Sequence, residues 1–145
     1  MVKTIRGLVI GGVLLSIVLT MTACARPGPE DGLETVNQAV RASSSAFDEV
    51  FVEEGLDGFS RYLFVELGST GETIPVDALS DALRSVGDAI PDGFESVRLI
   101  ARSSSGDRLD LEEPLEAAGV DGVFMISPKT ANIPAEAVRN FAGER

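Results

Sequence analysis

The strongest constraint on the fold lies at the start of the chain, where an apolar run from Gly7 to Thr20 ends shortly before the only cysteine, Cys24. Lys3 and Arg6 precede the run, and no acidic residue does. A charged start, a short apolar core and small residues before a break are typical of a secretory signal peptide. The run is shorter than the ~20 residues that a membrane-spanning helix needs. We therefore expect residues 1–23 to be a leader outside the folded domain.

The last residues of this leader carry a more specific signal. The stretch from Met21 to Cys24 resembles the lipobox of bacterial lipoprotein precursors, in which Ala23 would be the small residue before the cut and Thr22 the one ahead of it. Met21 fills the place that Leu usually holds in that family. The resemblance implies that the thiol of Cys24 receives a diacylglycerol and that a peptidase cuts just before it. The protein would then be held by lipid at the cell membrane, facing the extracytoplasmic side.

One further feature bears on this assignment. The chain has no twin-arginine pair, which favours the general secretory route. The alternatives are an ordinary signal peptide with an incidental cysteine, or an uncleaved membrane anchor. We expect residues 24–32 to form the lipidated N-terminus and a short extended linker, because Pro27, Gly28 and Pro29 fall in this stretch. Residues 33–145 are enough for a single domain.

The charge balance limits the partners. The chain has 12 basic and 23 acidic residues, and loss of Lys3 and Arg6 with the leader would leave ten basic residues and a net charge near −13. Such a surface repels nucleic acid and anionic lipid headgroups, so we expect neither as a ligand. Because no second cysteine exists, no internal disulfide can form, and a hydrophobic core must stabilise the domain alone.

Hydrophobic periodicity predicts the elements of that core. Apolar residues at helical spacing predict helices over 33–43, 74–90 and 134–141, with a short helical turn over 115–118. In the second helix, Leu79, Leu83, Val86 and Ile90 form one apolar stripe. Alternation predicts strands over 47–53, 60–67, 94–102, 108–111 and 122–126.

The two halves of the chain resemble each other. Val36 to Arg41 matches Leu79 to Arg84, and Phe47 to Val52 matches Phe94 to Leu99. Two helix–strand–strand units would give a four-stranded antiparallel sheet with both helices on one face. Chance similarity of two amphipathic segments is the alternative. In either case the expected class is α+β, a small antiparallel sheet with helices packed on one face.

The strand over 60–67 is apolar on both faces. Leu63, Val65 and Leu67 lie on one face, and Tyr62 and Phe64 lie on the other. We expect the C-terminal segment to cover the second face, because monomers rarely expose apolar patches. The alternative is an exposed patch that binds a partner.

Several classes of chemistry are excluded or disfavoured. The chain has no histidine, which removes Ser-His-Asp catalysis and most transition-metal ligation. Carboxylates could hold Ca²⁺ or act on a glycan. They gather at Glu53, Glu54 and Asp57, and again at Asp107, Asp110, Glu112 and Glu113. Neither cluster has the spacing of a calcium loop, so we interpret both as solvated surface. We expect no catalytic residue, metal or cofactor.

Three arginines form the remaining candidate site. Arg98 and Arg102 lie on the same face of one predicted strand, and Arg108 lies on the next. They would form an exposed basic strip on which an anionic partner or a cell-wall polymer could dock. The alternative is that cross-strand Glu or Asp residues pair with them.

The sequence therefore predicts a lipid-anchored domain that binds or scaffolds an envelope protein or a cell-wall polymer and is not an enzyme. Two other functions stay open. One is a carboxylate-dependent hydrolase of envelope glycans. The other is an accessory subunit of a membrane transporter or secretion system.

Overall fold

The computed structural model describes residues 28–145, and the expected anchor around Cys24 lies outside this range. The elements follow one another as α1 (Pro29–Ser43), β1 (Phe47–Asp57), β2 (Ser60–Ser69), α2 (Val76–Ala89), β3 (Ser96–Arg102), α3 (Glu112–Ala118), β4 (Phe124–Ser127), β5 (Thr130–Pro134) and α4 (Ala135–Gly143).

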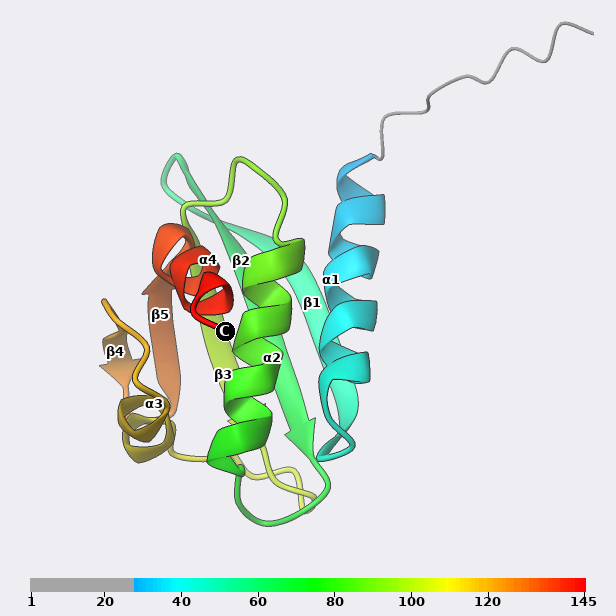
Figure 1. Cartoon of the computed structure of the whole chain (residues 1–145), viewed down its shortest axis with the longest axis vertical. Helices are drawn as coiled ribbons and strands as arrows, with labels where there is room; N and C mark the ends of the chain where they lie inside the picture. Colours follow the sequence, from blue (N-terminus) through cyan, green and yellow to red (C-terminus); the bar gives the residue numbers. More distant parts are fainter. Residues whose placement is uncertain (1–27) are drawn as a thin grey trace, which may run out of the picture.

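A single five-stranded sheet organises the domain. Its strand order is β1-β2-β3-β5-β4, and every neighbouring pair is antiparallel except β2 and β3. Helix α2 carries the chain from the end of β2 back to the start of β3, so these two strands run in the same direction. Helices α1, α2 and α4 lie over one face of the sheet (Figure 1). The expected α+β class, with helices packed against a mostly antiparallel sheet, is confirmed.

The prediction of two equivalent units is wrong in the second half of the chain. Residues 108–111 do not form a strand, since only Arg108 bridges Arg102. The chain then turns inward, where the Leu111 amide donates to the carbonyl of Pro128 at 2.8 Å and the Leu111 side chain is fully buried. The place beside β3 is taken by β5, a strand that the sequence did not predict.

Helix α1 starts earlier than predicted. It begins at Pro29, inside the expected linker, and not at Leu33. The carboxylate of Asp31 accepts a hydrogen bond from the amide of Gly28 at 2.9 Å, which satisfies a donor at the helix start. A proline is well tolerated in the first turn, because its missing N–H would have no partner there. Only four residues therefore separate Cys24 from the start of α1.

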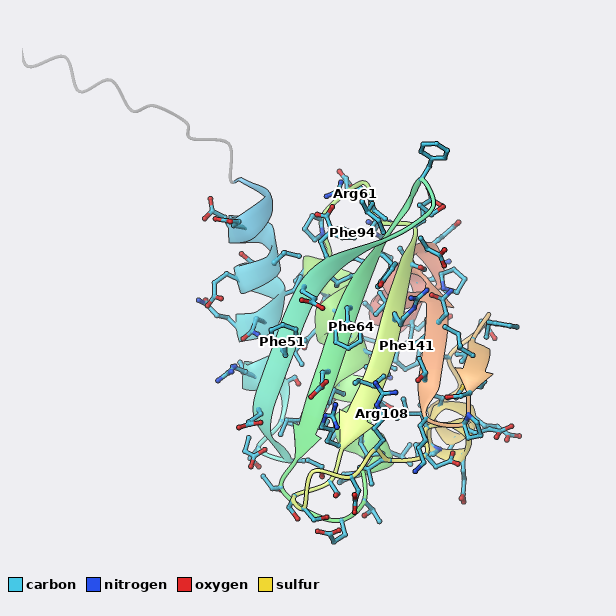
Figure 2. The ribbon with its side chains drawn as sticks, turned by 180° about the vertical axis from the view of Figure 1, so that it is seen from behind. Phe51, Arg61, Phe64, Phe94, Arg108 and Phe141 are labelled. Carbon is cyan, nitrogen blue, oxygen red and sulfur yellow. The ribbon has the colours of Figure 1, made fainter. Side chains whose placement is uncertain are left out.

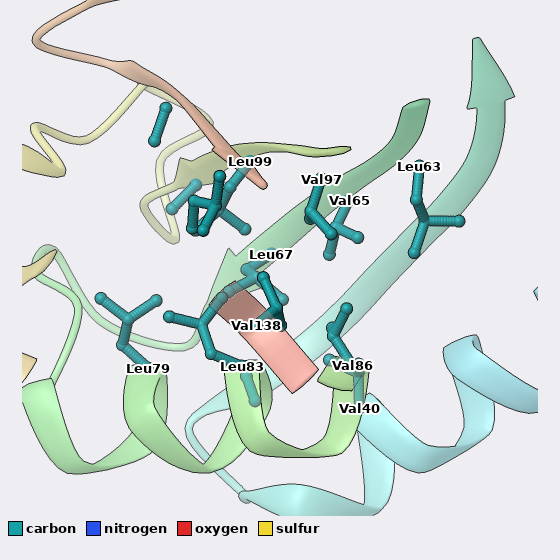
Figure 3. Packing of buried hydrophobic residues seen from close by; sticks show 14 of the residues in the cluster. Val40, Leu63, Val65, Leu67, Leu79, Leu83, Val86, Val97, Leu99 and Val138 are labelled. Atoms are coloured by element: carbon teal, nitrogen blue, oxygen red, sulfur yellow. The ribbon is translucent and has the colours of Figure 1, made fainter. Parts of the chain in front are cut away.

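The core lies between the sheet and the three helices (Figure 3). The predicted stripe of α2 is confirmed, since Leu79, Leu83 and Val86 are at most 1% exposed. They pack in one cluster with side chains from the sheet and from α1 and α4, among them Val65 and Val138. This packing leaves the second face of the sheet without a covering layer.

Candidate binding surface on the open face of the sheet

The face of the sheet opposite the helices is open (Figure 2). Side chains alternate between the two faces along a strand. On β2, Leu63, Val65 and Leu67 face the helices and are buried. Tyr62 and Phe64 point the other way and are half-buried. The expectation that the C-terminal segment covers this face is wrong, because β5 extends the sheet beside β3 and α4 packs on the helix side.

An aromatic patch, formed by Phe51 of β1 and Phe64 of β2, lies on this open face. The two ring centroids are 6.4 Å apart and the rings meet edge to face at 68°. Phe51 is nevertheless 52% exposed. Glu49 and Glu53 flank Phe51 on the same face, are exposed, and form no ion pair within residues 28–145. The patch is therefore an accessible apolar group beside unbalanced negative charge.

A further aromatic side chain lies on the opposite edge of the same face. Phe124 of β4 pairs with Asn132 of β5, which in turn pairs with Arg98 of β3. Because paired residues share a face, Phe124 belongs to the open face, and it is 66% exposed. Sequence reasoning missed this residue, since the facing of β4 cannot be assigned without β5.

Between these two edges, a stacked cluster fixes the first predicted arginine. The Tyr62 ring lies where a side chain on Gly55 would stand, so that a Cβ on Gly55 would overlap it. The guanidinium of Arg98 covers the ring, with its central carbon 3.9 Å from the ring centroid. Arg98 also forms an ion pair with Asp57 at 3.3 Å. Both faces of the Tyr62 ring are therefore occupied, and the charge of Arg98 is balanced within the domain.

The second predicted arginine is also paired. Arg102 donates through Nε to Glu66 at 2.7 Å, and its Nη1 donates to the carbonyl of Gly106 at 3.2 Å. Arg108 bridges Arg102 across a short antiparallel contact and is exposed. The structure thus brings the three predicted arginines to one region of the sheet, and two of them are paired with acidic residues, as in the alternative interpretation.

A shallow pocket of about 320 Å³ opens at the end of this face near the β1–β2 hairpin. Tyr62, Arg98, Ser96 and Asn132 contribute to its wall. The Nε atom of Arg98 is buried and has no hydrogen-bond partner within the described part of the chain. Because this atom is buried, the polar groups that the pocket presents to a bound molecule come from residues such as Ser96 and Asn132, beside Tyr62.

The acidic clusters of the sequence are not gathered into sites. Glu53 points to the open face, Glu54 binds Arg61 at 2.7 Å, and Asp57 is held by Arg98. The carboxylates over residues 107–113 are all exposed. Among residues 28–145, no three carboxylates lie where they could hold a metal ion together.

The Glu54–Arg61 pair predicts a pH dependence of stability. The hydrogen bond from Arg61 holds the pKa of Glu54 below its ordinary value. A group with a lowered pKa in the folded state stabilises the fold above its unfolded pKa, near pH 4.3, and this contribution is lost as pH falls through the folded pKa. We expect Glu54→Gln to lower the urea midpoint slightly at about pH 7 and to match the parent at about pH 2. A gap between the two midpoints that stays constant with pH would contradict this assignment.

Comparison with known proteins gives no family assignment, because no protein-family model, curated protein or solved structure matches the chain. Within residues 28–145, none of the helices has both the length and the apolar character required to cross a bilayer. The open face and the sequence before Gly28 are therefore the features that bear on the function.

Proposed function

We propose that this protein is a lipid-anchored component of the cell envelope whose small acidic domain binds another envelope protein and carries out no catalysis. The stretch from Met21 to Cys24 supports the anchor, since it has the pattern of a lipobox. The domain would face the extracytoplasmic side of the cell membrane.

The observation that carries the binding function is the uncovered sheet face with its aromatic patch. Aromatic side chains and arginine are enriched in protein interfaces, where apolar anchors are surrounded by a polar rim. The β1 edge of the open face has this composition, since Phe51 is more than half exposed and is flanked by Glu49 and Glu53. Phe124, on the other edge, is also more than half exposed. Phe51 and Phe64 are in contact on this face, so they form a contiguous aromatic patch and not a single scattered side chain.

The charges of this face favour a particular partner. Arg98 and Arg102 are already balanced by acidic neighbours, so they offer little net attraction to an anionic wall polymer. Glu49 and Glu53 beside Phe51 are not balanced within the described chain. We therefore infer a partner surface that presents an apolar group flanked by Lys or Arg. The Tyr62 ring, covered on both faces, cannot stack on a sugar ring.

Crosslinking in intact cells tests this proposal. A photoreactive phenylalanine analogue placed at Phe51 should form an adduct with a protein of the envelope. The same analogue at Asn140, an exposed position of α4 on the helix side, serves as the matched control and should form little. Equal adducts at both positions would mean that the open face has no special role, and adducts with glycan alone would favour wall binding.

A substitution at the patch should then weaken the complex. Truncating an aromatic anchor typically costs about 1–2 kcal/mol, so Phe51→Ala should lower affinity for the captured partner by about tenfold. Phe51→Tyr keeps the ring and should retain most of the affinity. An unchanged affinity of Phe51→Ala, measured by titration of the purified partner, would remove the aromatic patch from the interface.

A further inference from the structure

The tip of the β1–β2 hairpin presents two apolar side chains to solvent. Leu56 is 65% exposed and Phe59 is fully exposed. The two-residue loop consists of Gly58, with φ of 63°, followed by Phe59. A turn of this kind requires glycine at its first position and makes no demand for an aromatic residue at its second. Neither the turn nor the core of the domain therefore explains Phe59.

The body of the domain holds this tip in place. Arg61 binds the carboxylate of Glu54 through two hydrogen bonds of 2.9 and 2.7 Å, and its guanidinium lies 4.7 Å from the centre of the Phe94 ring. The Ser60 hydroxyl donates to Glu95 at 2.8 Å. These contacts join the hairpin to the loop before β3, so the apolar tip is held in a defined direction.

The tip lies at the end of the domain where the expected anchor is attached. Figures 1 and 2 both show the hairpin tip and the first turn of α1 at the same end of the molecule. One residue spans at most about 3.6 Å, so Cys24 lies within about 14 Å of Gly28. A lipid on Cys24 would thus hold this end of the domain against the bilayer surface.

We propose that the hairpin tip, through Phe59 and Leu56, inserts into the outer leaflet of the membrane in which Cys24 is anchored. This inference rests on the proposed lipid anchor. Aromatic and aliphatic side chains are favoured at the boundary between headgroups and acyl chains. Two acidic side chains of the hairpin are neutralised, since Asp57 pairs with Arg98 and Glu54 with Arg61. Glu95, which accepts from Ser60, and the first turn of α1 keep their negative charge, so the insertion is expected in a zwitterionic membrane surface and weakened by anionic headgroups. Two attachments, one covalent and one through the tip, would fix the orientation of the open sheet face relative to the membrane.

A single fluorescent reporter tests this contact. The chain has no tryptophan, so Phe59→Trp introduces the only one. The acylated full chain, purified from membranes, is reconstituted into phosphatidylcholine vesicles whose acyl chains are brominated. Phe124→Trp on β4, also a replacement of an exposed phenylalanine, is the matched control.

We expect the emission of Phe59→Trp to shift to shorter wavelength in vesicles and to be largely quenched by the brominated chains, with Phe124→Trp quenched little. Equal quenching of the two variants, or none at Phe59→Trp in a chain that floats with the vesicles, would overturn the insertion and leave the anchor standing. A chain that does not float with the vesicles would overturn both the anchor and the insertion.

Discussion

Replacement of Gly87 by alanine is expected to lower the free energy of unfolding by about 2 kcal/mol, although alanine is the better helix former. Gly87 lies on α2 where α4 crosses it. A Cβ at this position would overlap the carbonyl oxygen of Val138 and lie 2.8 Å from the Cβ of Ala142. Because the atom that this Cβ would overlap most closely belongs to the backbone of α4, the whole helix must shift to make room. We put the cost of overpacking at about 3 kcal/mol, against a helix-propensity gain of about 1 kcal/mol.

Urea unfolding of the purified chain measures this effect. Ser85→Ala on the same helix is the control, because Ser85 is only half-buried and the change raises helix propensity without adding volume. It should leave the midpoint unchanged or slightly raised. If Gly87→Ala were as stable as the parent, the close approach of α2 and α4 would have to be abandoned.

Replacement of Cys24 by serine is expected to abolish lipid attachment, the largest functional effect predicted for this chain. A serine cannot receive the diacylglycerol through a thioether. Each buried lipid CH₂ contributes about 0.8 kcal/mol, so loss of two acyl chains removes nearly all of the membrane affinity. The variant should incorporate no labelled fatty acid. It should then be released from membranes or accumulate as uncut precursor.

The matched control for this experiment is Met21→Leu. Leucine is the usual residue at this position of a lipobox, so labelling and membrane attachment should stay at the level of the parent or rise. A Cys24→Ser chain that is cut at the same site and is as firmly membrane-bound as the parent would show that the lipoprotein assignment is wrong.

Local pattern was sufficient to predict the helices and the first hairpin. The stripe of α2 repeats its apolar residues at helical spacing, and burial of Leu79 and Leu83 follows from it. The hairpin was placed correctly, but its turn was not. The first predicted strand ends at residue 53, whereas β1 continues to Asp57, so the loop is Gly58 and Phe59 alone. The alternation weakens there because Glu54, which pairs with the buried Leu63 and so lies on the helix side, is exposed and held by Arg61.

Strand partners could not be predicted in the same way. The similarity between the two halves predicts that a strand over 108–111 pairs with β3, yet the strand that pairs with β3 on that side is β5. That strand, Thr130–Pro134, is short, ends in proline and carries Asn132, so it has little strand signal of its own. Ala131 and Ile133 are buried, but their burial can be predicted only once the core that they complete is known.

The candidate site was predicted in part. The apolar second face of β2 was visible in the sequence through Tyr62 and Phe64. The pairing of Arg98 with Asp57 was not, because the two residues are far apart along the chain and the stack depends on the absence of a side chain at Gly55. Such contacts depend on strand register, which the pattern of a single strand does not contain.

If the chain is exported as proposed, the late position of β5 and α4 has a consequence for its folding. The last fifteen residues supply Ala131, Ile133 and Val138 to the core, all fully buried. A chain that crosses a membrane from its N-terminus delivers these residues last. The hairpin of β1 and β2 can pair early, but the sheet keeps an open edge at β3, and the core stays incomplete until the final segment emerges. By then the lipid on Cys24 would already hold the chain to the membrane, so the domain would complete its folding as a tethered molecule at that surface.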